Sequence, residues 1–254
     1  MITIGRIAVS VFRESVRDKV LYSLVFFAVL LMAVSYLIGQ LTAGEDVKII
    51  KDLGLAAISI FGLLIAVFIG IGLVWKEVDR RSIYSLLAKP MRRYEFVLGK
   101  YAGLALTLIV NVAAMTAAYY AVLAYLGGAD PALLEAVVLI IVELLLVTAV
   151  ALFFSTFSSP FLSAVLTIGL WVIGNFNADL RNFGDIVDSP VAVWTARTVY
   201  HVLPDFGIFD IKTQVVHGLA VPWSYVGLTA AYGFVYIALL LTGGVIIFSR
   251  RDFK

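Results

Sequence analysis

The chain is poor in cysteine, histidine and charge. It contains no cysteine among its 254 residues, so disulfides and thiolate metal sites are excluded. Only two histidines are present, His201 and His217. Charged residues make up 14% of the chain, whereas soluble domains have about 25%. Hydrophobic residues make up 62%, against about 45–50% in soluble domains, and this excess indicates a polytopic membrane protein.

Sequence motifs for catalysis are also absent. Gly99-Lys100 has the Gly-Lys pair of a phosphate-binding loop, but Tyr101 follows where Ser or Thr is required. The chain has neither His-Glu-x-x-His nor Gly-x-Ser-x-Gly. We therefore expect no enzymatic activity and no metal or cofactor in this chain. Four metal-ligating side chains in its later part match no motif by their spacing, and we expect them to be ordinary loop residues: His201, Asp205, Asp210 and His217.

Long apolar runs with few charges predict six membrane-spanning helices. A helix needs about 20 residues to cross the hydrocarbon, and the bilayer requires the backbone to satisfy its own hydrogen bonds. The predicted spans are residues 20–39, 53–75, 101–125, 132–154, 161–177 and 223–248, of which the fifth is the shortest. The predicted fold is an all-α integral membrane protein with a single transmembrane domain over residues 1–254.

Basic residues indicate how these spans are oriented. Residues 1–19 contain four Lys or Arg, residues 76–100 contain seven and the tail 250–254 contains three. Only five lie in the remaining connections. The positive-inside rule therefore places both termini and the 76–100 loop in the cytoplasm, and residues 178–222 on the other side.

The N-terminal 19 residues predict an amphipathic helix that lies in the membrane interface before the first span. Its apolar residues recur at helical spacing and are Ile4, Ile7, Ala8, Val11, Phe12 and Val16. Its opposite face carries Arg6, Arg13, Glu14 and Arg17. Such a helix either anchors the start of the first span or binds a partner, and the sequence leaves both open.

The segment 178–222 predicts two short interfacial or re-entrant helices between the fifth and sixth spans. Asp188-Ser189-Pro190 is a helix start, with a capping residue before a proline in the first turn, and Pro204 ends that helix. A second apolar stretch, Ile211–Val221, ends at Pro222.

Two sets of residues inside the spans are candidates for a translocation path or for helix packing. Glu143 lies near the middle of the fourth span, where an ionisable side chain costs about 2.5–3.5 kcal/mol or more. Asn111 lies at a similar depth in the third span and is a possible hydrogen-bond partner. Gly62, Ala66 and Gly70 form a small-residue stripe in the second span, which predicts close helix packing within the chain or across a homodimer.

The loop of residues 76–100 carries the clearest functional signal. Ten of its 25 residues are charged, and seven of these are basic. A charged block held against the membrane indicates a docking surface for a soluble partner. Basic clusters beside a span also bind anionic lipid, but Glu77, Asp79 and Glu95 interrupt this one.

The stretches Glu77–Pro90 and Arg93–Gly103 resemble the cytoplasmic loop of type-2 ABC exporter permeases. The likeness is to the six-span group that includes the permease of nitrous-oxide-reductase maturation. It implies a permease homodimer in a prokaryotic plasma membrane, bound to separate ATPase subunits that hold ATP and Mg. Residues 1–19 would be the connecting helix and Glu77–Leu87 the coupling helix. The coupling residues so implied are Glu77, Asp79, Arg80, Arg81, Tyr84, Leu86, Leu87, Pro90 and Arg92.

Two other classes remain open from the sequence. A membrane-embedded scaffold subunit would use the basic loop for lipid alone. A secondary carrier would favour broken helices in internal repeats, which the sequence lacks. No nucleic-acid partner is expected, and the transported substrate is not indicated.

Overall fold

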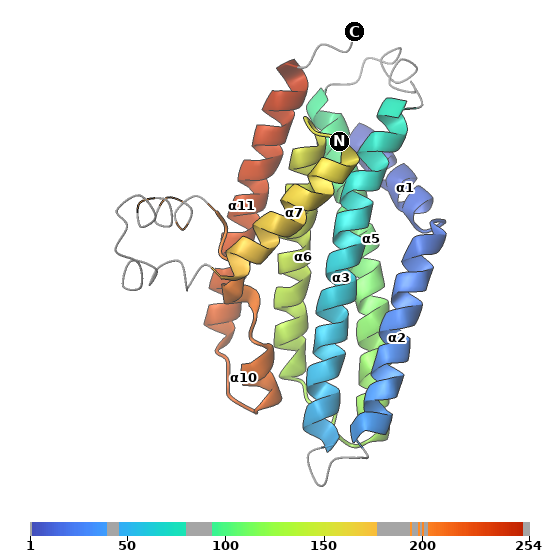
Figure 1. Cartoon of the computed structure of the whole chain (residues 1–254), viewed down its shortest axis with the longest axis vertical. Helices are drawn as coiled ribbons and strands as arrows, with labels where there is room; N and C mark the ends of the chain where they lie inside the picture. The colour runs from blue at the N-terminus through green and yellow to red at the C-terminus, as the bar shows by residue number, and fades with distance from the viewer. Residues whose placement is uncertain are drawn as a thin grey trace.

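The structure is a computed structural model that describes residues 2–39, 46–79, 93–176, 194, 198, 200 and 203–250. All regular secondary structure in these ranges is helical, which confirms the predicted all-α class. The long helices run side by side along one axis (Figure 1). The start of α1 and the end of α11 lie at the same end of this bundle, together with the end of α3 and the start of α5 (Figure 1).

Five helices in the described ranges have the length and composition to cross a membrane. They are α2 (Lys19–Gly39), α3 (Asp46–Asp79), α5 (Arg93–Tyr125), α6 (Leu133–Ser155) and α11 (Trp223–Arg250). The predicted fifth span is α7 (Pro160–Asn175), which has 16 residues and runs obliquely to the others (Figure 1). The membrane class is therefore confirmed, while the count of six spans stays a prediction.

The helices on either side of the charged loop are longer than predicted. We expected spans over 53–75 and 101–125, whereas α3 covers Asp46–Asp79 and α5 covers Arg93–Tyr125. Charged residues end a hydrophobic run but do not end a helix, and Glu95 in the first turn of α5 favours the helix dipole. The expected loop over 76–100 is therefore wrong at both ends, because residues up to 79 and from 93 are helical.

α6 forms the centre of the bundle and is buried on most of its surface. The small-residue stripe of α3 packs against it. A Cβ atom at Gly70 would lie 2.6 Å from the Cβ atom of Ala151, and one at Gly62 would overlap the side chain of Leu144. Ala66 is 1% exposed. These residues therefore serve packing within the chain, and the homodimer hypothesis for this stripe is wrong.

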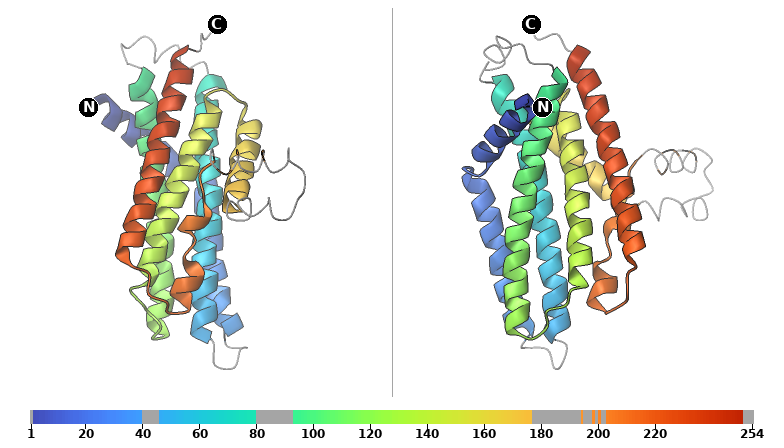
Figure 2. Two further views of the ribbon diagram at one scale, coloured as in Figure 1. Left: turned by 90° about the vertical axis from the view of Figure 1, so that its left-hand side faces the viewer. Right: turned by 180° about the vertical axis from the view of Figure 1, so that it is seen from behind.

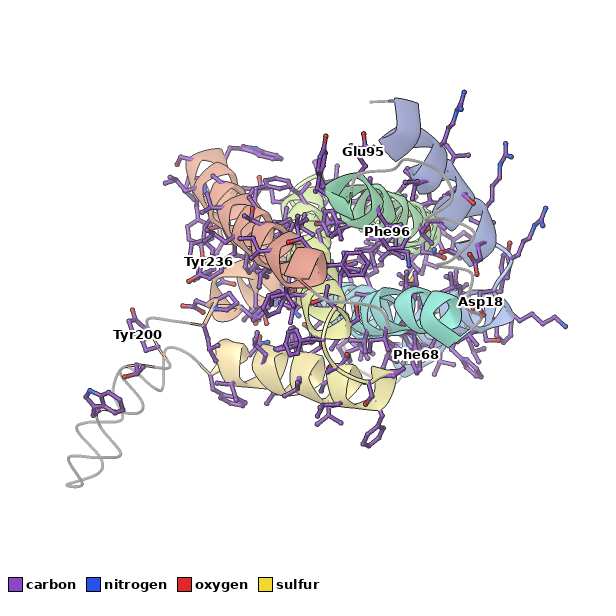
Figure 3. The ribbon with its side chains drawn as sticks, turned by 90° about the horizontal axis from the view of Figure 1, so that it is seen from above. Asp18, Phe68, Glu95, Phe96, Tyr200 and Tyr236 are labelled. Carbon is purple, nitrogen blue, oxygen red and sulfur yellow. The ribbon has the colours of Figure 1, made fainter. Side chains whose placement is uncertain are left out.

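The amphipathic helix α1 (Ile2–Ser15) packs beside α5 at the edge of the bundle (Figure 3). Two glycines of α5 permit the close approach. A Cβ atom at Gly99 would lie 2.8 Å from the Cβ atom of Ile7, and one at Gly103 would lie 2.7 Å from the Ala8 carbonyl oxygen. Val11 is buried at this contact. The predicted amphipathic pattern is confirmed, but the apolar face is covered by α5.

Residues 203–216, in the segment after α7, pack into the bundle. Its short helices are η2 (Gly207–Phe209) and α10 (Lys212–Val216), and α10 lies toward the end opposite the termini (Figure 1). The buried side chains here are Phe206, Phe209, Ile211, Val215 and Val216. The helix expected over Ile211–Val221 is wrong at its end, because Gly218 adopts a φ of 70° two residues after α10. The start predicted at Asp188 lies outside the described residues.

Candidate functional site

Glu143 is buried inside the bundle and accepts a hydrogen bond from α7. Its side chain is 5% exposed, and the indole Nε1 of Trp171 donates to Oε1 at 2.7 Å. α7 runs obliquely to the long helices (Figure 2), and the contact comes from its residue Trp171. A hydrogen bond between buried groups is costly to leave unmade. The contact therefore holds α7 against α6 at one defined point.

Asn111, the predicted partner of Glu143, forms its hydrogen bond elsewhere. Asn111 donates from Nδ2 to the Thr107 carbonyl oxygen at 2.7 Å, one turn earlier in α5. The hypothesis of a Glu143–Asn111 pair is therefore not supported, and Trp171 takes that place. The sequence did contain a signal for it, because an indole N–H inside an apolar span requires an acceptor.

A partly buried cation lies near Glu143 and joins α10 to α3. The ammonium of Lys212 lies 3.5 Å from Oδ2 of Asp210 and donates to Oγ of Ser59 at 3.4 Å. Lys212 and Asp210 both interact electrostatically with Glu143. We call Ser59, Glu143, Trp171, Asp210 and Lys212 the polar cluster. Its members come from α3, α6, α7 and the segment that ends in α10.

The side chains of the polar cluster can form hydrogen bonds and ion pairs. The cluster offers one cation, two carboxylates, an indole N–H and the single hydroxyl of Ser59. It has no histidine to activate that hydroxyl. Among the residues that the structure describes, no group of three or more side chains is arranged to hold a metal ion. His217 instead hydrogen-bonds through Nδ1 to the Thr213 carbonyl oxygen at 2.8 Å, and His201 lies outside the described residues.

The segment 203–211 connects α7 to α11 through backbone contacts. The Phe206 N–H donates to the Gly174 carbonyl oxygen at 3.0 Å, near the end of α7. The Asp205 N–H donates to the Tyr232 hydroxyl oxygen at 2.9 Å. Tyr225 donates its hydroxyl to the Ile208 carbonyl oxygen at 2.8 Å. A shift of α7 would therefore be passed to α10 and α11.

An ion pair joins α3 to the connection between α5 and α6. Lys51 of α3 lies 3.1 Å from Oδ2 of Asp130, in the connection between α5 and α6. The backbone N–H of Ala132 and the ammonium of Lys51 lower the pKa of Asp130 below its usual range. Tyr120 donates to the Asp130 carbonyl oxygen at 2.9 Å. This connection is thereby fixed to α3.

Two of the coupling residues implied by the sequence lie at the end of α3. Glu77 and Asp79 belong to the last turns of α3. The others fall in residues 80–92, outside the described residues: Arg80, Arg81, Tyr84, Leu86, Leu87, Pro90 and Arg92. The stretch is rooted directly in two long helices, so any force on it acts on both.

Lys100 is a buried cation that the sequence assigned to the loop. It lies in α5 and is 1% exposed, with its ammonium 4.5 Å from the centre of the Phe96 ring. Phe96 lies on the side of α5 that faces the bundle (Figure 3) and stacks on Phe248 at 5.7 Å between ring centres. This contact joins the ends of α5 and α11 near the loop. An aromatic residue four positions before a lysine was the available signal.

The candidate residues of the connecting helix lie on its outer face. Arg6, Arg13 and Glu14 are exposed on α1, and Arg17 is exposed in the turn that follows it. The structure thus separates three features that the sequence grouped only by charge: an exposed basic face on α1, a charged connection between α3 and α5, and a polar cluster toward the other end.

Comparison with known proteins identifies the family. The family model described as ABC-2 family transporter protein matches residues 6–184, which is most of the chain. The match covers α1 to α7 and the charged connection. No curated protein matches the sequence.

Proposed function

The chain belongs to the ABC-2 family of transporter proteins, and we propose that it is the permease of an exporter driven by a separate ATPase subunit. As a member of this family it is a membrane permease, and permeases of the family generally work with an ABC ATPase subunit. The observation that carries the proposal is that α3 ends at Asp79 and α5 begins at Arg93 at the same end of the bundle as the start of α1 and the end of α11 (Figure 1), with the charged residues 80–92 between them in the sequence.

The two helices that flank this connection can carry a movement across the membrane. α3 has 34 residues and α5 has 33, so each extends for about 50 Å at 1.5 Å per residue. Ser59 lies twenty residues before the end of α3, about 30 Å along the helix. A tilt imposed at Asp79 would therefore change the contact between Ser59 and Lys212 at the polar cluster.

The polar cluster is the proposed control point of the translocation path. Lys212 holds α10 to α3, and Trp171 holds α7 to Glu143 of α6. Weak contacts such as the 3.4 Å bond between Lys212 and Ser59 can break and reform during a transport cycle. Glu143 would then hold α7 to α6 while the contact between α10 and α3 opens. The direction of transport, which we take as export, follows from the resemblance of the loop.

The assembly we propose contains two permeases and two ATPase subunits, with ATP and Mg bound only by the latter. Both termini and the 80–92 connection would be cytoplasmic, in the plasma membrane of a prokaryote. The likeness to the nitrous-oxide-reductase maturation group stays a prediction.

Affinity purification of the full chain from its own membranes tests the proposal. We expect an ABC ATPase to co-purify, with ATP hydrolysis that is lost when that subunit is removed. ATP hydrolysis by the purified chain alone would contradict the proposal. Recovery of the chain from these membranes without any ATPase would favour a scaffold role.

A further inference from the structure

The outer face of α1 and the turn that follows it carry three arginines without an acidic partner in the described part of the chain. Arg6, Arg13 and Arg17 are exposed, and none forms an ion pair with a described carboxylate. They border an open hollow of about 920 Å³ whose described lining comes from α1 and the turn after it: Gly5, Arg6, Val9, Ser10, Arg13, Glu14 and Arg17. This face is therefore accessible and positively charged.

The apolar face of α1 does not explain how the helix meets the membrane. An interfacial helix usually inserts that face among the lipid chains. Here Ile7, Ala8 and Val11 pack against Gly99 and Gly103 of α5 instead. Protein covers the apolar side, and the face directed away from the bundle is the basic one (Figure 3).

The depth of α1 favours lipid over a soluble partner as the occupant of this face. Gly99 and Gly103 lie six and ten residues after the start of α5 at Arg93, which is about 9 and 15 Å inside its end. α1 lies beside the bundle and short of the ends of α5 and α11 (Figure 2). The first apolar span, α2, begins only four residues after α1 ends. The outer face of α1 is thus at the level where α2 meets the lipid headgroups.

We propose that the outer face of α1 binds the phosphodiester headgroups of anionic phospholipids through Arg6, Arg13 and Arg17. Arg6 and Arg13 are seven residues apart, which places them along one side of α1. Arg17 follows in the turn two residues after α1 ends. The planar guanidinium matches phosphate oxygens with paired hydrogen bonds. Glu14 lies on the same face and repels a phosphate, so it limits the affinity. The inference does not depend on ATPase coupling.

A lipid-quenching experiment tests the proposal directly. The absence of native cysteine allows a Ser10→Cys variant of the full chain to be labelled with a fluorophore on this face. The labelled protein is placed in vesicles of phosphatidylcholine with one fifth phosphatidylglycerol. In one sample the phosphatidylglycerol carries a spin label on its headgroup, and in a second sample the phosphatidylcholine carries it. We expect stronger quenching by labelled phosphatidylglycerol than by labelled phosphatidylcholine.

Substitutions of the charged residues on this face test how strongly each one contributes to the phosphatidylglycerol preference. Arg6→Gln, Arg13→Gln and Arg17→Gln should each weaken the apparent phosphatidylglycerol association about fivefold. Glu14→Gln should strengthen it. Lys48→Gln removes an exposed cation at the other end of the bundle and should change nothing. A triple variant combines the three arginine substitutions and should lose the preference. Because it can fold poorly, wild type is also measured in 1 M salt, where screening should reduce the preference.

Three results would overturn the proposal. Equal quenching by the two labelled lipids would show that the face has no charge preference. A preference that persists in the triple variant and in 1 M salt would place the source elsewhere. A preference that disappears when the ATPase subunit is bound would identify a protein as the occupant of this face.

Discussion

The indole Nε1 of Trp171 donates a 2.7 Å hydrogen bond to Oε1 of Glu143, and this bond joins α7 to the most buried helix of the bundle. Trp171→Phe should remove the donor and leave a buried acceptor unsatisfied, at a cost of about 1–3 kcal/mol. Glu143→Gln should cost less, because an amide oxygen still accepts from the indole. Thermal unfolding of both variants in detergent measures the difference.

A double variant separates this bond from simple loss of packing. Trp171→Phe combined with Glu143→Leu removes both partners, so the loss of stability should be smaller than the sum of the two single losses. Additive losses would mean that the hydrogen bond contributes nothing of its own.

The contact between α3 and α6 should not tolerate a methyl group at Gly70. Its Cβ atom would lie 2.6 Å from the Cβ atom of Ala151, and overpacking of this kind costs about 1–3 kcal/mol. In the Gly70→Ala variant, the second substitution Ala151→Gly should restore part of the lost stability. Gly227→Ala is the matched control in α11, where nothing lies within 4 Å, and it should be neutral or stabilising. If Gly70→Ala were as stable as Gly227→Ala, the packing assigned to this stripe would be wrong.

The Lys51–Asp130 pair should make the connection between α5 and α6 sensitive to acid. The folded structure lowers the pKa of Asp130 below its ordinary value of 3.8. The unfolded connection therefore binds the proton first as pH falls, and stability rises with pH over this range. The pair should stabilise the fold fully above about pH 5 and lose its contribution progressively below the ordinary pKa.

The variant Asp130→Asn measures this contribution. The difference in Tm between wild type and Asp130→Asn should be largest near neutral pH and should shrink as the pH falls from 5 to 3. A difference that stays constant over that range would show that the carboxylate charge has no part in holding the connection.

Hydrophobic length predicted the helices inside the membrane well and their ends poorly. The expected span 132–154 is α6 at Leu133–Ser155, and 223–248 is α11 at Trp223–Arg250. The second and third spans extend well past their apolar runs because charged side chains outside the hydrocarbon are compatible with a continuing helix. Hydropathy reports where lipid ends, whereas the helix ends where backbone hydrogen bonding does.

The sequence predicted the buried carboxylate of the candidate site but not the residues that surround it. The depth of Glu143 in its span correctly marked a buried carboxylate, because apolar residues surround it in the sequence. Its partner was missed because the choice between Asn111 and Trp171 depends on the oblique path of α7, which no residue pattern reports. Lys212 was missed for a similar reason, since only the return of the chain after α7 brings it to Ser59.

Paired charge reversals in the connection between α3 and α5 test the central claim most directly. Glu77→Lys and Arg81→Glu are each co-expressed with the ATPase subunit, and co-purification and ATP hydrolysis in liposomes are measured. Mispaired charges at an interface cost several kcal/mol, so docking into a matched cleft predicts that both variants release or uncouple the ATPase. If Glu77→Lys behaves as wild type while Arg81→Glu fails, the connection binds lipid alone and the proposed coupling is contradicted.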